Sequence, residues 1–242
     1  MYEGLTVGAV IPARDEAENI GEVVGGLLAL RTAAGQRVVD DIVVCDNGSA
    51  DATAERARAA GARVAVEQTP GYGRACLTAL AALRPVDVIL FVDGDRSCDL
   101  RQTLDLLRAT ADGADLVIGS RVLGRMEPGA LSPPQIAGNR VASLLIRLLW
   151  GHRVTDLGPF RAIRADALRR LDMRDTAYGW TVEMQIKAIR MRMRIVETPV
   201  DSRRRRFGRS KVGGTVRGVV GASIGILGMI VRLRTRRATP EP

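Results

Sequence analysis

The stretch 86–95, VDVILFVDGD, limits most strongly what this chain can fold into. It begins with β-branched and apolar residues, which is typical of a buried central strand. It ends in two carboxylates, Asp93 and Asp95, separated by Gly94. Carboxylate oxygens suit Mg²⁺ or Mn²⁺, which also bind phosphate oxygens, and open α/β sheets bind ligands at the carboxyl ends of their strands. The stretch therefore predicts a central strand that ends at a metal site, the alternative being a solvated acidic turn.

Apolar segments alternate with amphipathic ones along most of the 242 residues. Strands are predicted near residues 5–11, 42–45, 63–67, 86–92, 114–119 and 194–199, with a short one ending near 163. Helices are predicted near residues 15–30, 49–60, 71–83, 100–111, 136–150, 166–171 and 178–191. This alternation indicates βαβ units. We expect an α/β fold, a single domain with a mainly parallel central sheet flanked by helices.

The net charge is +9, and the basic residues concentrate between residues 190 and 237. Such a charge favours phosphate-bearing partners or an anionic membrane surface. Only 3% of residues are aromatic, so stacking on single-stranded nucleic acid has little support and no nucleic-acid partner is expected. The three cysteines are odd in number and lack metal-ligand spacing, which favours a reducing compartment. The first residues lack the features of a signal peptide.

The C-terminal part is expected to form a separate element. We predict a catalytic domain over residues 1–211, a helix over 212–237 and a disordered tail over 238–242. Residues 218–231 are 14 uncharged residues, and as a helix they reach about 21 Å, short of a ~30 Å hydrocarbon core. No transmembrane helix is therefore expected. The helix would pack on the core, lie in a membrane interface with its flanking arginines on lipid phosphates, or pair with a second copy.

Polar loops follow successive predicted strands, and in a parallel sheet such loops meet at one edge. Asp46, at the end of its strand, can accept a hydrogen bond from the N–H of a nucleotide base. Pro12 and Arg14 would form a wall for the nucleoside, and Glu16 would hold a ribose hydroxyl or anchor Arg14. These side chains predict a nucleotide-sugar site.

The phosphates of such a ligand would lie near the metal. Asp93 and Asp95 would hold a divalent ion that bridges the diphosphate and stabilises it as a leaving group. Gly71 opens the loop before the helix at 71–83, and Arg74 would either assist the phosphates or cap that loop.

Four motifs carry a resemblance to a known family: PARDE at 12–16, DNGSAD at 46–51, GYGRA at 71–75 and DGD at 93–95. In order and spacing they resemble the GT-A fold glycosyltransferases of family 2. Further segments, GSR at 119–121, the region 156–164 and RFGRSK at 206–211, resemble the polyprenyl-phosphate (dolichol-phosphate-type) mannosyl- and glucosyltransferases. The resemblance covers about residues 5–217. It implies a metal-dependent, inverting enzyme, peripheral on the cytoplasmic face of a membrane, which moves a hexose from UDP-glucose or GDP-mannose to a polyprenyl phosphate.

The resemblance also implies roles for single residues. Asp46 would contact the base, and Asp93 and Asp95 would bind Mg²⁺ or Mn²⁺. Arg121 and Arg140 would bind the acceptor phosphate. The loop that closes over the donor diphosphate would include Arg206, Ser210 and Lys211. The chain departs from the family's usual wording at Gly94, Arg96, Ser97 and the segment LGPF at 157–160.

The chemistry of the acceptor remains open. A phosphate oxygen is already anionic and needs no strong base, so Asp95 and Arg121 would carry catalysis. A hydroxyl of a small molecule or polysaccharide would need a general base, for which Glu183 is the first candidate and Asp156 the second. The alternative for Glu183 is a carboxylate favoured by the helix dipole, and Trp180 either stacks on a sugar or fills the core. A catalytically silent nucleotide- or phosphoinositide-binding module is a third reading.

Overall fold

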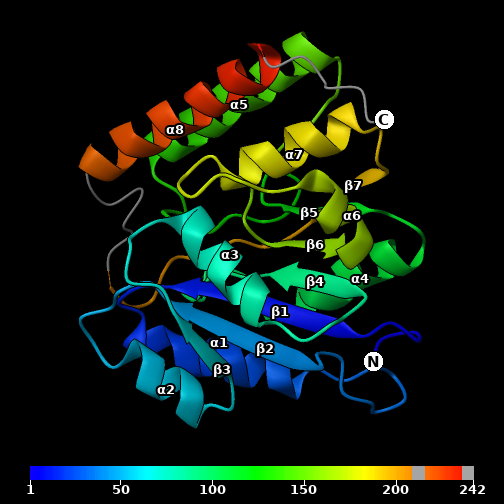
Figure 1. The fold of residues 1–242 in the computed structure, drawn as a ribbon, viewed down its shortest axis with the longest axis vertical. Coiled ribbons are helices and arrows are strands. Elements are labelled where there is room, and N and C mark those ends of the chain that lie inside the picture. Colours follow the sequence, from blue (N-terminus) through cyan, green and yellow to red (C-terminus); the bar gives the residue numbers. More distant parts are fainter. Residues whose placement is uncertain (209–215, 236–242) are drawn as a thin grey trace.

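Seven strands form the central sheet, in the order β3-β2-β1-β4-β6-β5-β7 (Figure 1). The computed structural model describes residues 1–208 and 216–235. The strands are β1 (Val7–Ala13), β2 (Asp41–Asp46), β3 (Arg63–Val66), β4 (Val88–Phe91), β5 (Leu116–Ser120), β6 (Arg161–Arg164) and β7 (Ile195–Pro199). All neighbours run parallel except β6, which is antiparallel to both β4 and β5. The predicted mainly parallel sheet is confirmed.

Helices cover both faces of this sheet. They are α1 (Ala17–Ala29), α2 (Thr53–Ala59), α3 (Tyr72–Ala82), α4 (Thr103–Ala111), α5 (Pro133–Trp150), α6 (Ala165–Leu171), α7 (Trp180–Arg190) and α8 (Val216–Thr235), with a 3₁₀ turn over Leu100–Gln102. Alternate residues of β1 point to opposite faces. Ala9 and Ile11 join the apolar layer under α1 and α4, while Val10 joins the layer under α3, α6 and α7. Burial on both faces explains why the strands read as nearly continuous apolar runs.

The reversed strand β6 brings additional chain to the edge where the other strands end. Arg161, the first residue of β6, pairs with Phe91 near the end of β4 and with Ile118 near the end of β5. Pro199, the last residue of β7, pairs with Ser120 at the end of β5. The loop before β6 and the segment after β7 therefore lie at the same edge as the loops after β4 and β5.

The C-terminal helix α8 lies beside α5 at one end of the molecule (Figure 1). Its inner face packs on α5 and α7 through Met229, Ile230 and Leu233. The helix has 20 residues, more than the uncharged stretch alone suggested. In the described part of the chain one span, Gly218–Thr235, with a mean hydropathy of 1.4, is long and apolar enough to cross a membrane. The expectation of no such helix was thus too narrow, because it counted only uncharged residues. The tail at 238–242 lies outside the described residues.

Candidate active site

The two aspartates after β4 lie at the edge of the sheet with unequal surroundings. Asp93 accepts a hydrogen bond from the hydroxyl of Tyr72 at 3.0 Å. Burial, together with the negative charge of Asp95, raises the pKa of Asp93 to about 7. A carboxylate whose pKa stays raised next to another carboxylate is not fully neutralised by the cations around it, here Arg121 and Arg205. A further positive charge can therefore be accommodated beside it.

Gly94 lets this pair lie close against the core. A Cβ atom at Gly94 would lie 3.3 Å from the Ile20 side chain and 3.4 Å from that of Ala13. Contacts at these distances leave little room for a larger side chain. The glycine therefore allows the two aspartates to sit against β1 and α1.

One guanidinium bridges two carboxylates at this edge. Arg205 contacts Oε1 of Glu16 at 2.6 Å through Nη1 and Oδ2 of Asp95 at 2.9 Å through Nη2. Glu16 is buried, and its other oxygen accepts a hydrogen bond from Asn19 at 2.8 Å. Glu16 thus pairs with Arg205, while Arg14, its predicted partner, is exposed.

Arg205 was not among the predicted site residues, although its neighbour Arg206 was. Arg206 is exposed, and its guanidinium carbon lies 5.3 Å from the ring centroid of Phe207. Ser210 and Lys211, also predicted for this loop, lie outside the described residues. The run of arginines from 203 to 206 signalled a cationic loop, but not which member reaches the site.

The carboxylates present fit a divalent metal that shares its ligands with a substrate. Among residues 1–208 and 216–235, no group of three or more His, Cys, Asp or Glu side chains is arranged to hold a metal ion. Mg²⁺ typically takes one or two protein carboxylates and completes its shell with phosphates and water. Asp93 and Asp95 satisfy that requirement, and the guanidinium on Asp95 shows that the position accepts a cation.

The end of β2 is organised by Asn47, the second residue of the DNGSAD motif. Asp46 is half-buried, and its Oδ1 accepts the backbone N–H of Ser49 at 3.1 Å. Asn47 donates to the carbonyl oxygens of Glu67 and Thr69 and accepts the N–H of Gly71 at 2.8 Å. Asn47 therefore ties the predicted base-binding strand end to the loop before α3. Pro12 is buried within β1 beside them.

The glycines at the start of α3 admit another backbone segment. Cβ atoms at Gly71 and Gly73 would overlap the carbonyl oxygens of Thr176 and Asp175, respectively. The N–H groups of Gly73 and Arg74 donate to the carbonyls of Ala177 and Thr176, both at 3.1 Å. These donors are therefore satisfied within the chain. The buried Nε of Arg74 has no partner among the described residues.

Glu183 holds that same segment in place. Its carboxylate accepts the backbone N–H groups of Arg174 and Asp175, the shortest at 2.7 Å, and pairs with Lys187 at 2.7 Å. It is 3% exposed. These contacts describe a brace between α7 and the loop that touches α3. Trp180, whose role was left open, is buried in the core with its ring edge-to-face on Phe91.

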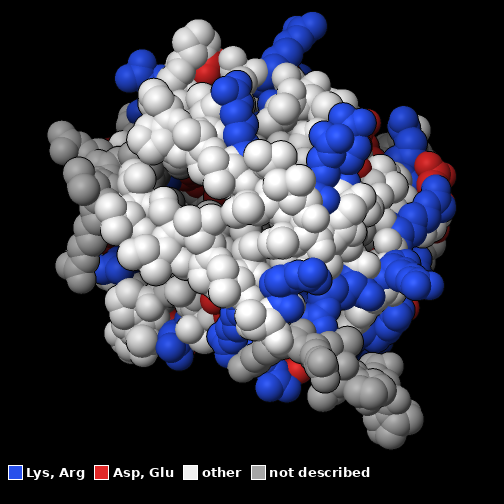
Figure 2. Space-filling view, turned by 90° about the horizontal axis from the view of Figure 1, so that it is seen from above, with Lys and Arg blue, Asp and Glu red and all other residues white. Residues whose placement is uncertain are grey.

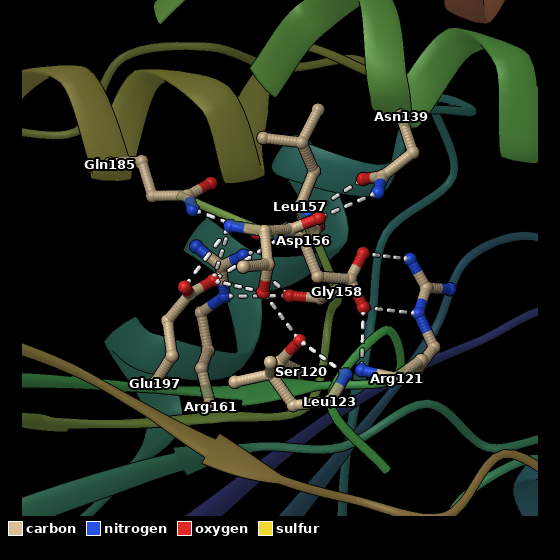
Figure 3. Close-up of polar contacts among 11 residues, drawn as sticks. Ser120, Arg121, Leu123, Asn139, Asp156, Leu157, Gly158, Arg161, Gln185 and Glu197 are labelled. Atoms are coloured by element: carbon tan, nitrogen blue, oxygen red, sulfur yellow. Dashed lines mark hydrogen bonds and ion pairs between the residues drawn. The ribbon is translucent and has the colours of Figure 1, made fainter. Parts of the chain in front are cut away.

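Arg121, which follows β5, forms an ion pair with the buried Asp156 of the loop before β6 (Figure 3). Arg121 donates to the Asp156 carboxylate from its backbone N at 2.8 Å and from Nε and Nη2, each at 2.7 Å. Burial acts to raise the pKa of Asp156, but the bonds from Arg121 outweigh it and hold the pKa below its ordinary value. Asp156 is therefore an ionised partner of Arg121 and is poorly suited to accept a proton.

The loop 155–158 that carries Asp156 is itself held on every side, as Figure 3 shows. Four surrounding elements supply the side chains: Asn139 of α5 bonds Thr155 and Leu157, Gln185 of α7 bonds Asp156, Arg161 of β6 bonds Gly158, and Glu197 of β7 bonds Thr155. Only Oε1 of Gln185 lacks a partner among the buried side-chain atoms of these four residues in the described chain. A polar network this well connected rigidifies its loop. Arg121 is consequently presented in a fixed position.

Arg140, the second predicted acceptor residue, lies elsewhere. It follows Asn139 on α5, but it is exposed and has no polar partner in the described part of the chain. The structure brings Arg121 to Asp156 and does not bring Arg140 to either of them.

The comparisons with known proteins decide the family. The family described as glycosyl transferase family 2 matches residues 9–172. This chain is a family 2 glycosyltransferase. It is 33% identical over 234 residues to an undecaprenyl-phosphate mannosyltransferase of Micrococcus luteus, covering 91% of each chain. It is 34% identical over 220 residues to an uncharacterised glycosyltransferase of Mycobacterium tuberculosis, covering 90% of this chain and 94% of that one. The protein is thus an enzyme of the hexosyltransferase kind.

Solved structures agree on the fold. The glucosyl-3-phosphoglycerate synthase of Mycobacterium tuberculosis, in complex with Mn²⁺, UDP and phosphoglyceric acid, matches with a TM-score of 0.75. The match covers 98% of this chain and 81% of that one at 21% identity. The predicted GT-A-like α/β fold of this glycosyltransferase is confirmed.

Proposed function

We propose that this glycosyltransferase moves a hexose, with inversion, from a nucleotide-diphosphate sugar to the phosphate of a polyprenyl phosphate. The observation that carries this proposal is that Arg121 is held in place and that both predicted base candidates, Asp156 and Glu183, are engaged with other groups. Arg121 is locked by Asp156, whose pKa is lowered, and Glu183 is engaged with backbone N–H groups and Lys187. An acceptor that arrives already ionised needs no proton removed.

On the donor side, Asp93 and Asp95 would hold Mg²⁺ or Mn²⁺. When bound, the ion would offset the negative charge of the diphosphate of UDP-glucose or GDP-mannose and so stabilise it as the leaving group. Asp46 would contact the base, with Pro12 and Arg14 beside the nucleoside and Gly71 and Arg74 toward the phosphates. The resemblance that suggests these roles is supported by their shared position at one edge of the sheet.

The reaction mainly requires that the protein position the donor and the acceptor. A phosphate oxygen of the acceptor forms a bond to the anomeric carbon as the bond from that carbon to the diphosphate breaks on the opposite face. No proton is transferred in this step. Arg121 would orient the acceptor phosphate and offset its charge, and placement of this kind is a large part of catalysis.

A lipid acceptor requires access to a membrane, and one face of the molecule suits that. Seven of the twelve large apolar side chains that are exposed in the described chain lie on the adjacent helices α5 and α8: Val141, Leu144, Leu148, Val220, Ile224, Leu227 and Val231. Exposed arginines on the same helices are Arg140, Arg147, Arg232 and Arg234. Figure 2, seen from this end, shows a largely uncharged surface bordered by Lys and Arg side chains. We call these two helices the α5–α8 face.

An apolar surface with cationic flanks fits an anionic bilayer, with the aliphatic side chains among acyl chains and arginines on lipid phosphates. Peripheral binding to the cytoplasmic face of a membrane is the localisation we propose. A second copy of the chain covering the α5–α8 face is the alternative.

A second candidate function has a specific observation in its favour. Over 100 residues, 38% of this chain, the sequence is 40% identical to a glucosyl-3-phosphoglycerate synthase of Mycolicibacterium paratuberculosis. By analogy the acceptor would be a hydroxyl of a small phosphorylated acid or of a polysaccharide, and the enzyme would act in solution.

The deciding experiment is a transfer assay with UDP- and GDP-sugars and either Mg²⁺ or Mn²⁺. Polyprenyl phosphate, free polyprenol and 3-phosphoglycerate serve as acceptors, with a chelator control. We expect product with the polyprenyl phosphate alone, abolished by chelator. Product with 3-phosphoglycerate instead would establish the second function, and product that persists with chelator would remove the metal from the proposal.

Membrane binding is tested separately. Sedimentation with vesicles containing phosphatidylglycerol should retain the wild type but not the double variant Leu148→Glu plus Ile224→Glu. Val66→Glu, at an exposed apolar position on β3, is the matched control and should bind like the wild type. A loss of dimer on light scattering, with vesicle binding unchanged, would instead assign the α5–α8 face to a second copy.

A further inference from the structure

The guanidinium of Arg205 occupies a position that the proposed metal would need. It contacts Oδ2 of Asp95 at 2.9 Å, while Oδ1 of Asp95 accepts the backbone N–H of Ser97 at 3.0 Å. Both oxygens of Asp95 therefore have partners. A cation at Asp95 can gain Oδ2 only if Arg205 moves.

The pair is sheltered from solvent on both sides. The side chain of Arg205 is 18% exposed, that of Asp95 16% and that of Glu16 7%. Charge-assisted hydrogen bonds in such surroundings are stronger than exposed ones. Arg205 is thus a firm counter-ion for Glu16 and Asp95, and not a side chain passing over the surface.

The backbone leading to Arg205 is anchored to the domain. Arg203 donates its backbone N–H to Ser97 at 2.8 Å and pairs with Asp99 at 2.7 Å. The backbone N–H of Arg204 donates to the Glu127 carboxylate at 2.8 Å. With these anchors in place, release of Asp95 requires only a change in the Arg205 side chain.

We propose that Arg205 and the divalent metal exclude each other at Asp95, so that Arg205 is the resident cation of the metal-free enzyme. The inference rests on the proposed function in taking Asp95 as a metal ligand. A metal ion that arrives alone must break the bond to Arg205 without compensation. A metal that arrives with a nucleotide diphosphate brings anionic oxygens that can accept the released guanidinium. Metal and nucleotide therefore bind the free enzyme cooperatively, and Arg205 determines how strongly the binding of one favours the binding of the other.

The experiment measures Mn²⁺ binding to the full chain by electron paramagnetic resonance of the free ion, without nucleotide. Arg205→Gln keeps a polar side chain but removes the charge, and we expect it to bind Mn²⁺ about tenfold more tightly than the wild type, a difference of about 1.4 kcal/mol. Arg204→Gln removes the same charge from an exposed neighbour and controls for the general electrostatic effect. Its affinity should match that of the wild type.

A second measurement adds UDP. The nucleotide should tighten Mn²⁺ binding in the wild type and do so much less in Arg205→Gln. Arg205→Lys keeps a charge that reaches only one carboxylate, should give an intermediate affinity, and serves if the glutamine variant does not fold. Equal Mn²⁺ affinity in the wild type and the Arg205 variants would overturn the exclusion but leave the metal site. No Mn²⁺ binding by any of these folded proteins, with or without UDP, would overturn both.

Discussion

The two sides of the sheet edge differ in how fully their charged side chains are paired. On the proposed acceptor side, Arg121 and Asp156 pair with each other, and side chains from four elements hold the loop that carries Asp156. On the donor side, Asp93 has a pKa raised to about 7, and Asp95 relies on Arg205 for its counter-ion. On the proposed acceptor side, a cation for an anionic ligand is already in place. On the proposed donor side, two carboxylates can bind a divalent cation once Arg205 releases Asp95.

The physical cause of this difference is the arrangement of like and unlike charges. An ion pair with good geometry and further hydrogen bonds can be buried at acceptable cost, and it then stays rigid. Two neighbouring carboxylates repel each other and are stable together only with an added positive charge. The following predictions test whether substitutions and pH affect the two sides differently.

The largest effect is expected from Asp95→Asn. Loss of this proposed metal ligand should lower turnover at least about a hundredfold. The reason is that a bound metal stabilises the charge on the leaving group in the transition state by several kcal/mol. The melting temperature should change little, because the lost repulsion with Asp93 offsets the lost ion pair with Arg205. Asp105→Asn, at an exposed position on α4, is the control for both assays. A collapsed thermal transition in Asp95→Asn would give Asp95 a structural role.

Arg121→Lys should act on the acceptor alone. Lysine keeps the charge but loses the two-pronged contact with Asp156, so we expect the KM for the acceptor to rise about tenfold or more. The affinity for the nucleotide-sugar should be unchanged in calorimetry. Lysine is preferred to alanine, which would leave the buried Asp156 without its cationic partner at a cost of about 3–5 kcal/mol.

Arg140→Ala provides the contrast to this variant. Because Arg140 is exposed and apart from the Arg121 ion pair, its loss should raise the acceptor KM less. Equal effects of Arg121→Lys on donor and acceptor would remove the assignment of Arg121 to the acceptor side.

The dependence of Mn²⁺ affinity on pH should reflect the titration of Asp93 on the proposed donor side. The pKa of Asp93 in the folded, metal-free protein is about 7, above its ordinary value of 3.8. Mn²⁺ must displace that proton, so the affinity should rise with pH, by up to about tenfold per unit, and level off above about 7. Titrations between pH 5.5 and 8.5 would show this, and Asp93→Asn should abolish the slope.

The same shift has a consequence for stability. Between pH 3.8 and about 7 the folded state keeps a proton on Asp93 that the unfolded chain has lost. The contribution of Asp93 to the free energy of unfolding therefore falls as the pH rises through this window. Saturating Mn²⁺ should cancel the fall. Asp156, whose pKa is lowered, should add no pH dependence in this window.

The smallest effect on turnover is expected from Glu183→Gln. As a brace, Glu183 should contribute about 1–3 kcal/mol to stability through its buried hydrogen bonds. Its replacement should then lower the melting temperature while changing kcat by less than about tenfold. A general base would contribute about 10²–10⁴-fold and would impose an acidic limb on the pH profile of kcat. A loss of that size, with stability intact, would favour a hydroxyl acceptor.

Much of the fold could be predicted from the sequence because its signals are local. Periodicity and turn residues located all seven strands of the sheet and the helices between them. Asp93, Gly94 and Asp95 were expected at the end of a buried strand, and Asp95 does lie at the edge where the loops meet. The ordered motifs also indicated the family that the comparisons show.

The remaining features depend on contacts between distant segments. The antiparallel direction of β6 places Asp156 beside Arg121, and the direction of a strand is not encoded in its four residues. Which of four consecutive arginines reaches Asp95 depends on how residues 203 and 204 are anchored to other loops.

Glu183 and Gly73 show the same limit. The sequence marked one as a candidate base and the other as part of a Gly-rich loop, and the structure shows that both contact the segment 174–177. The sequence by itself determined the strands, the helices and the kinds of side chain at their ends, because neighbouring residues control those choices. Only the tertiary structure decided which of those side chains meet, because that depends on the order and direction of strands far apart in the chain.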